Sequence, residues 1–125
     1  LNDTRLRVSG RSRLIECIFA TGVPYGGRTD LPDTLQDLAR LMPACAGVRR
    51  WGSAALDMSY VAAGRYEGFW ERNLNAWDLA AGLVILREAG GFAEAADPEG
   101  DILTDGSVIA GNAEIFEKFA KIIRN

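Results

Sequence analysis

The stretch from Glu71 to Gly91, ERNLNAWDLAAGLVILREAGG, constrains the fold more than any other part of this sequence. Residues 79–86 carry no charge, and Ala80, Ala81 and Gly82 leave one side of a helix almost without side-chain atoms. A helix that is apolar on every side is stable only where other elements cover it. The pattern therefore predicts a buried helix inside a layered domain, and the glycine pair at its end predicts where it stops.

Two acidic residues precede the apolar part of this helix. Asp78 follows Trp77 directly, and Glu71 lies seven residues upstream of Asp78. As a helix cap, the Asp78 carboxylate would accept backbone N–H groups and complement the helix dipole. As a functional group, it would be a ligand for a divalent cation. The local sequence leaves both interpretations open, and it also leaves Glu71 open between an exposed strand-end residue and a site residue.

The composition is that of one soluble globular domain. The chain has 125 residues, of which 48% are hydrophobic and 25% are charged. A net charge of −3 weighs against binding to nucleic acid or to a membrane surface. No apolar run approaches the roughly 18 residues that span a bilayer, and no signal peptide is recognised.

The absence of histidine restricts the chemistry. It excludes a histidine general base, a Ser-His-Asp triad and histidine metal ligands, so any metal must be held by carboxylate and carbonyl oxygens. Such ligands favour a hard cation such as Mg²⁺. Cys17 and Cys45 have no CxxC spacing and lie among apolar neighbours, which predicts buried reduced thiols and a cytoplasmic protein.

Segments with strand and helix patterns alternate along the chain, which predicts an α/β layered domain with a mixed sheet flanked by helices. The expected strands cover residues 4–8, 14–21, 48–51, 66–71, 92–95 and 108–110. The expected helices follow Asp30, follow Ser53, run from about Trp77 to Ala89, and run from Ala113 to Arg124 after an Asn112 cap. Residues 97–106 are expected to form a polar turn region.

Three junctions place polar groups at strand ends, where ligands bind in open α/β sheets. They are the strand end at Glu71, the helix start at Asp78, and the turn Arg49-Arg50-Trp51-Gly52-Ser53-Ala54. Gly52 would let a ligand approach the backbone, and the free N–H groups of the helix after it suit an oxyanion or a hydroxyl. The alternatives are plain helix capping at this turn and a solvated surface charge at Arg49.

The remaining carboxylates do not complete a hydrolytic metal site. Two-metal hydrolysis of phosphate esters requires several carboxylates that hold cations about 3.5–4 Å apart. Asp97, Asp101 and Asp105 have a spacing that does not fit an EF-hand loop, so they are interpreted as turn residues. Asp57, inside the second expected helix, is interpreted as structural.

The segments WDLAAG (residues 77–82) and EAGG (residues 88–91) together resemble the C-terminal signature of the inositol monophosphatase family. The segments VRRWGSAALD (48–57), YVAAGRYEGFWE (60–71) and VIAGN (108–112) are similar to the bacterial branch, including its suppressor-type members. The resemblance covers nearly the whole chain. It implies a layered αβαβα fold, Mg²⁺ dependence, lithium sensitivity, a homodimer, and hydrolysis of a phosphomonoester, with myo-inositol 1-phosphate as the expected substrate.

The resemblance also implies roles for single residues. Asp78 corresponds to a metal ligand of the family, and Glu71 to the acidic residue that holds an inositol hydroxyl. The substrate-side residues that it implies are Glu71, Gly52, Ser53, Ala54 and Arg49.

The chain departs from the family pattern in one respect. The other metal ligands of the family, and the groups that activate water, belong to an upstream Glu-containing motif and a DPxDGT-like motif, which are absent here. Residues 1–125 are therefore expected to be a C-terminal domain without the N-terminal catalytic half, and inactive alone. No catalytic residue is assigned within it.

Two alternatives remain for the function. The substrate could be that of a sibling enzyme: fructose 1,6-bisphosphate, an adenosine bisphosphate, histidinol phosphate or NADP. The protein could instead be a non-catalytic partner of the transcription machinery, in contact with RNA polymerase or elongation factors. Neither membrane contact nor direct nucleic-acid binding is expected.

Overall fold

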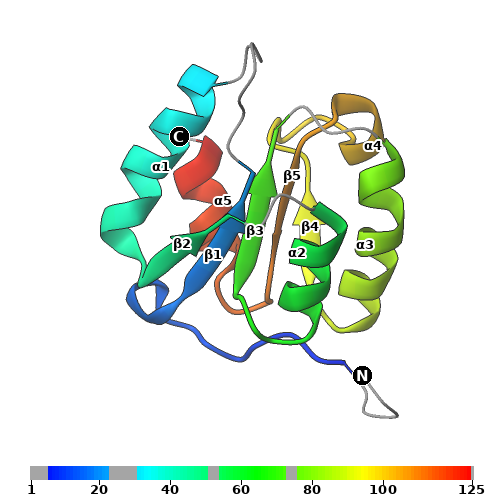
Figure 1. The fold of residues 1–125 in the computed structure, drawn as a ribbon, viewed down its shortest axis with the longest axis horizontal. Helices are drawn as coiled ribbons and strands as arrows, with labels where there is room; N and C mark the ends of the chain where they lie inside the picture. The colour runs from blue at the N-terminus through cyan, green and yellow to red at the C-terminus, as the bar shows by residue number, and fades with distance from the viewer. Residues whose placement is uncertain (1–5, 23–30, 51–53, 73–75, 125) are drawn as a thin grey trace.

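The computed structural model describes residues 6–22, 31–50, 54–72 and 76–124. Within these segments, strands form one sheet that lies between two layers of helices (Figure 1). This arrangement confirms the predicted α/β layered domain with a mixed sheet flanked by helices.

The described sheet has five strands in the order β2-β1-β3-β5-β4. The strands are β1 Ile18–Thr21, β2 Gly47–Arg49, β3 Gly68–Glu71, β4 Phe92–Glu94 and β5 Val108–Gly111. β1 pairs in parallel with β2 and β3, whereas β5 pairs antiparallel with β3 and β4. The three parallel strands therefore have their carboxyl ends at one edge of the sheet.

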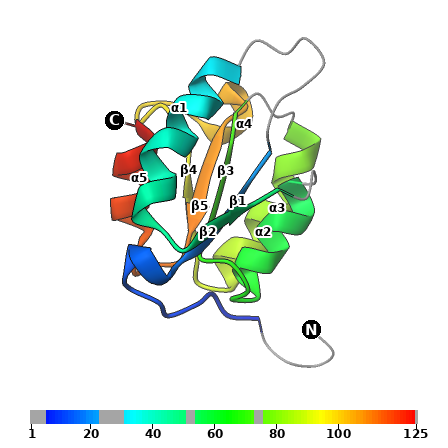
Figure 2. The same ribbon diagram turned by 60° about the vertical axis from the view of Figure 1, so that its left-hand side comes forward.

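Within the described segments, helices cover both faces of the sheet. The α-helices are α1 Leu31–Leu41, α2 Ala54–Ala62, α3 Ala76–Glu88, α4 Ile102–Asp105 and α5 Phe116–Arg124, and the 3₁₀ turns are η1 Leu14–Glu16 and η2 Met42–Ala44. Figure 2 shows α1 and α5 on one side of the sheet and α2 and α3 on the other.

Alternation along the strands divides the core into two clusters. On β3, Phe69 packs in the cluster on the α2/α3 side, and the next residue, Trp70, packs in the cluster on the α1/α5 side. Successive strand residues point to opposite faces, so this pair fixes which face each neighbouring side chain reaches. Full burial of such a side chain stabilises the fold by about 1.5–3 kcal/mol.

A glycine sets the distance between α2 and α3. A Cβ atom at Gly82 would lie 2.5 Å from Met58 Cε and 3.1 Å from Met58 Cβ and Sδ. The absence of a side chain at Gly82 therefore lets Met58, which is fully buried, fill the space between the two helices.

The prediction that α3 is buried on every side is wrong for this chain. Leu79, Leu83 and Leu86 are buried, but Val84 is 58% exposed and Ile85 is 36% exposed. The sheet and α2 cover one side of α3, whereas the side that carries Val84 and Ile85 is left partly exposed by the described segments.

Several expected element boundaries differ from the structure. Residues 6–8 form no strand, although Val8 N donates to Ala89 O at 3.1 Å. The expected strand 14–21 begins with the 3₁₀ turn η1, and only its second half is β1. The expected loop at residues 25–30 lies outside the described residues.

Two local predictions at the chain's C-terminal end are confirmed in part. Asn112 Oδ1 accepts from Ile115 N at 2.9 Å, which is the hydrogen bond expected of a capping residue. The bond closes a turn over residues 113–115, however, and the helix α5 begins only at Phe116 rather than at Ala113.

Of the three aspartates interpreted as turn residues, Asp97 forms a turn contact, since its Oδ1 accepts from Glu99 N. Asp105 instead lies in the helix α4, and the Asp101 Oδ2 that accepts from Thr104 N belongs to the cap of that helix. The sequence did not predict this short helix.

The two cysteines are buried free thiols, as predicted. Burial is the main reason why the pKa of Cys17 rises to about 11, and burial also raises the pKa of Cys45. In the segments that the structure describes, no helix combines the length and the apolarity needed to cross a membrane.

Candidate functional site

The carboxyl edge of the parallel strands is the candidate site. β1 ends at Thr21, β2 at Arg49 and β3 at Glu71, and the next helix begins after each of these strand ends. In open α/β sheets, ligands bind outside the carboxyl ends of the strands. The N-terminal ends of helices at such an edge also offer unpaired backbone N–H groups.

Glu71 is the carboxylate that the structure places at this edge. Its residue is only 8% exposed, and by alternation with Trp70 its side chain belongs to the α2/α3 face. A Cβ atom at Gly22, the residue after β1, would overlap the Glu71 carboxylate. The glycine therefore provides the space in which that carboxylate lies.

The sequence interpretation missed this role of Gly22, the residue that follows the expected strand 14–21. A detectable signal exists, because Gly22 directly follows a buried strand at the edge where ligands are expected. The local sequence could not show that Gly22 faces the Glu71 carboxylate, since β1 and β3 are far apart in the sequence.

Asp78 is the third residue of α3, which begins at Ala76. It is therefore in the first helical turn rather than at the N-cap position, and a carboxylate there still interacts favourably with the helix dipole. Residues 72–75 alone separate Glu71 from the helix, so both acidic residues lie near the same junction. The side chain of Asp78 is outside the described part of the structure.

The turn between β2 and α2 is described only in part. Arg49 is exposed at the end of the edge strand β2, and β1 lies between β2 and β3. Arg49 thus shares the carboxyl edge with Glu71 but starts from a strand that is not its neighbour. Ala54 is the first residue of α2, whereas Gly52 and Ser53 lie outside the described residues.

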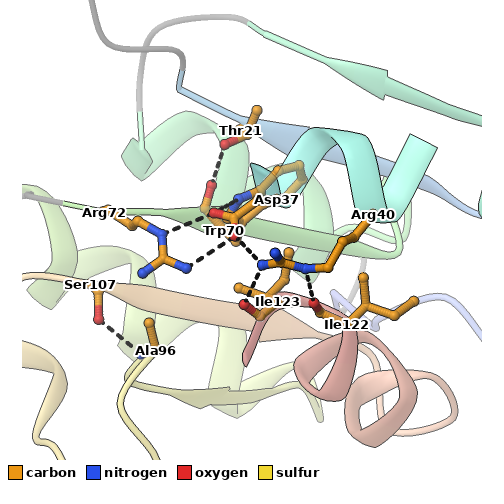
Figure 3. Close-up of polar contacts among 9 residues, drawn as sticks. All are labelled: Thr21, Asp37, Arg40, Trp70, Arg72, Ala96, Ser107, Ile122 and Ile123. Carbon is orange, nitrogen blue, oxygen red and sulfur yellow. Dashed lines mark hydrogen bonds and ion pairs between the residues drawn. The ribbon is translucent and has the colours of Figure 1, made fainter. Parts of the chain in front are cut away.

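A buried carboxylate on the opposite face holds the end of β3 (Figure 3). Asp37, on α1, is fully buried and accepts from Trp70 Nε1 at 3.1 Å. It also accepts from Arg72 Nε at 2.9 Å, Arg72 Nη2 at 3.0 Å and Arg40 Nη2 at 2.9 Å. The sequence interpretation did not identify Asp37, because its contacts with β3 span more than 30 residues and leave no local pattern.

The arrangement has a limited chemical repertoire. A nearly buried carboxylate such as Glu71 can accept charge-assisted hydrogen bonds from ligand hydroxyls. Among the described residues, no group of three or more His, Cys, Asp or Glu side chains could hold a metal ion. The described edge thus offers a hydroxyl acceptor, and it does not by itself form a complete hydrolytic metal centre.

Comparisons with known proteins cover the whole chain. The family model described as the inositol monophosphatase family matches residues 1–125. An inositol-1-monophosphatase of Mesorhizobium japonicum is 49% identical over 124 residues, which are 99% of this chain and 47% of that protein. A Nus factor SuhB of Pseudomonas aeruginosa is 40% identical over 126 residues, 99% of this chain and 46% of that protein.

Among solved structures, the extragenic suppressor protein suhB from Bartonella henselae has a TM-score of 0.93 and 45% sequence identity to this chain. The match covers 99% of this chain and 48% of that one. The chain therefore spans about half the length of the relatives that it matches.

Proposed function

This chain belongs to the inositol monophosphatase family, as its WDLAAG and EAGG segments predicted, and from that premise we propose that it forms the substrate-side half of a magnesium-dependent phosphomonoester hydrolase. The proposed reaction is hydrolysis of myo-inositol 1-phosphate to inositol and phosphate. One observation carries the proposal: the nearly buried Glu71 carboxylate lies at the carboxyl edge of the sheet, in space that Gly22 leaves open.

Glu71 would orient the substrate by accepting a hydrogen bond from a hydroxyl of the sugar ring. A carboxylate in a nearly water-free position makes stronger hydrogen bonds than a neutral acceptor does. A site that uses such a bond discriminates against an analogue without the hydroxyl, because the buried acceptor would then lose its partner. The backbone of Gly52, Ser53 and Ala54 would line the same pocket, with Arg49 on the substrate side.

The proposed cofactor is Mg²⁺, with Asp78 as one ligand. The donor set is consistent with a hard cation, because the chain has no histidine and offers carboxylates at the junction of β3 and α3. Such a cation supplies Lewis acidity and activates water in phosphate-ester hydrolysis. We propose that the other ligands belong to an upstream half, which together with this chain forms the intact protein.

The test uses Asp78→Asn in the intact protein, assayed by phosphate release from myo-inositol 1-phosphate over a range of Mg²⁺ concentrations. We expect kcat to fall and the Mg²⁺ concentration for half-maximal activity to rise by about tenfold or more. Mutation of a residue that only hydrogen-bonds to a metal ligand already reduces metal affinity or activity about tenfold or more, and loss of a ligand itself should cost at least as much. Asp33→Asn, an exposed carboxylate on α1, is the control for charge. An unchanged magnesium dependence in Asp78→Asn would refute the assignment.

The choice of substrate is the next question. Glu71 favours a polyol, but the sibling substrates fructose 1,6-bisphosphate, adenosine bisphosphates and NADP also carry hydroxyls, and histidinol phosphate carries an amino group that a carboxylate can also bind. A panel of these esters on the intact protein separates them by kcat/KM. A preference for any of them over myo-inositol 1-phosphate would replace the proposed substrate.

The second candidate function is that of a non-catalytic partner of RNA polymerase or of elongation factors. It is favoured by the similarity to relatives named as Nus factors. A pull-down from cells with the intact protein as bait tests for such partners. If this function is the relevant one, Asp78→Asn will lose phosphatase activity and retain both the partners and the cellular phenotype of the unaltered protein.

We also propose a cytoplasmic homodimer that lithium inhibits. The family premise supports all three properties, and the buried free thiols Cys17 and Cys45 are compatible with a reducing compartment. Light scattering of the intact protein tests for the dimer, and a lithium titration at fixed Mg²⁺ tests for inhibition.

A further inference from the structure

The buried carboxylate of Asp37 lies close to the end of β3 but on the face away from Glu71. It is 0% exposed, and its two oxygens accept hydrogen bonds from Trp70, Arg72 and Arg40. A buried carboxylate is stable only when donors replace the water that it has lost. The side chains of Arg40 and Arg72 are partly exposed, at 28% and 25%, to a cavity of about 370 Å³ between α1 and the C-terminal end of α5.

Two of the three donors are the residues on either side of Glu71. Trp70 and Arg72 point to the α1/α5 face, where Asp37 lies, and Glu71 between them points to the α2/α3 face. Figure 3 shows Asp37 between Arg72 and Arg40, with the Trp70 ring beside it. Asp37 thereby fixes the backbone on both sides of the residue that the proposed function requires.

Other hydrogen bonds connect the Asp37 contacts with Trp70, Arg72 and Arg40 to the rest of the fold. Thr21 Oγ1 donates to Trp70 O at 2.7 Å, which joins the ends of β1 and β3. Arg40 also donates to the carbonyl oxygens of Ile122 and Ile123 in the last turn of α5. The end of β3 is therefore held from α1, β1 and α5 together, and Asp37 is the acceptor shared by the three donors on the α1/α5 face.

We propose that Asp37 is a positioning residue for Glu71, which it sets through Trp70 and Arg72 so that the carboxylate meets a substrate hydroxyl. The inference rests on the proposed function, because it needs Glu71 to bind that hydroxyl. A small displacement of the Glu71 carboxylate would strongly reduce the reaction rate of a substrate whose hydroxyl it binds. It would not affect the rate of a substrate without that hydroxyl.

The test compares two substrates of the intact protein: myo-inositol 1-phosphate, which carries ring hydroxyls, and 4-nitrophenyl phosphate, which carries none. We expect Asp37→Asn to lower kcat/KM for myo-inositol 1-phosphate about tenfold and to change kcat/KM for 4-nitrophenyl phosphate less than about twofold. Asp33→Asn is the matched control, since Asp33 lies one turn earlier on α1, lines the same cavity and is exposed.

A purely structural role predicts a different result. Asp37→Asn would then lower activity on both substrates equally, in parallel with a loss of thermal stability, and that outcome would overturn the inference, as would unchanged activity on both. Arg72→Gln is the second variant, because it removes one donor from a partly exposed position and leaves Asp37 in contact with Trp70 and Arg40. It should show the same substrate dependence even if Asp37→Asn does not fold.

Glu71→Gln separates failure of this inference from failure of the proposed function. If Glu71→Gln loses activity only on myo-inositol 1-phosphate and neither Asp37→Asn nor Arg72→Gln does, Asp37 is no positioning residue and the proposed role of Glu71 stands. If Glu71→Gln does not distinguish the two substrates, the proposed role of Glu71 fails and the inference about Asp37 fails with it.

Discussion

Asp57 shows what a single buried charge does in this fold. It lies in α2 with no exposed surface, and neither carboxylate oxygen has a hydrogen-bond partner among the described residues. Burial raises its pKa from 3.8 to about 6. The sequence interpretation of Asp57 as a structural residue gave no direction for its effect on stability. Burial without a partner implies that, at neutral pH, its ionised form destabilises the described fold.

We expect Asp57→Asn to be more stable than the unaltered chain by about 1–3 kcal/mol at neutral pH. The folded-state pKa lies above the unfolded one, so the folded state binds more protons between these values. The stability supplied by the protonated carboxyl is present below about pH 4 and is lost as the pH rises through about 6.

Urea unfolding at about pH 4.5 and about pH 7.5 measures this difference. The gain from Asp57→Asn should be large at the higher pH and small at the lower one. Asp33→Asn, on the exposed side of α1, should show neither effect. An equal change at both pH values would contradict the burial explanation.

Gly22 allows a second prediction at the residue scale. A methyl group at this position would overlap the Glu71 carboxylate and displace it. In the intact protein we expect Gly22→Ala to lower kcat/KM for myo-inositol 1-phosphate about tenfold or more, as misplacement of a binding group does. Gly10→Ala is the control, because no atom lies within 4 Å of its new methyl group. Equal activity of the two variants would show that Glu71 needs no such space.

At the scale of elements, the contact between α2 and α3 depends on Gly82. Alanine favours a helix over glycine by about 1 kcal/mol, but here its methyl group would meet Met58. Overpacking of a core costs about 1–3 kcal/mol, so we expect Gly82→Ala to be a net destabilisation. In a double-mutant cycle with Met58→Ala, the loss of unfolding free energy in the double variant should be about 1 kcal/mol smaller than the sum of the losses in the two single variants. Additive effects would mean that the two residues do not compete for space.

The elements also show where local sequence patterns are informative. Helical periodicity and caps predicted α1, α3 and α5, and Asn112 does make a capping hydrogen bond, over the turn that precedes α5. The patterns failed at residues 6–8 and at η1 and α4, which are short and take their conformation from contacts elsewhere. For the candidate site, the position of Glu71 at a strand end could be predicted locally, whereas the contacts of Gly22 and Asp37 could not, because their partners lie across the fold.

For the whole molecule, the decisive fact is that the chain spans about half the length of its relatives. The described residues contain no cluster of acidic or thiol ligands, and α3 leaves Val84 and Ile85 exposed. We therefore expect the purified 125-residue chain to release no phosphate from myo-inositol 1-phosphate with Mg²⁺ present. A rate like that of a full-length relative would contradict the division of the site that we propose.

The strand order has a consequence for the time course of synthesis. β1 lies between β2 and β3 in the sheet but precedes both in the chain, and its paired residues Phe19 and Gly68 are 49 residues apart. At a synthesis rate of about 5–20 residues per second, roughly 3–10 s pass between the synthesis of β1 and that of β3. An apolar strand without its partners binds other chains readily. The nascent protein therefore passes through an interval in which the unpaired β1 makes it prone to aggregation.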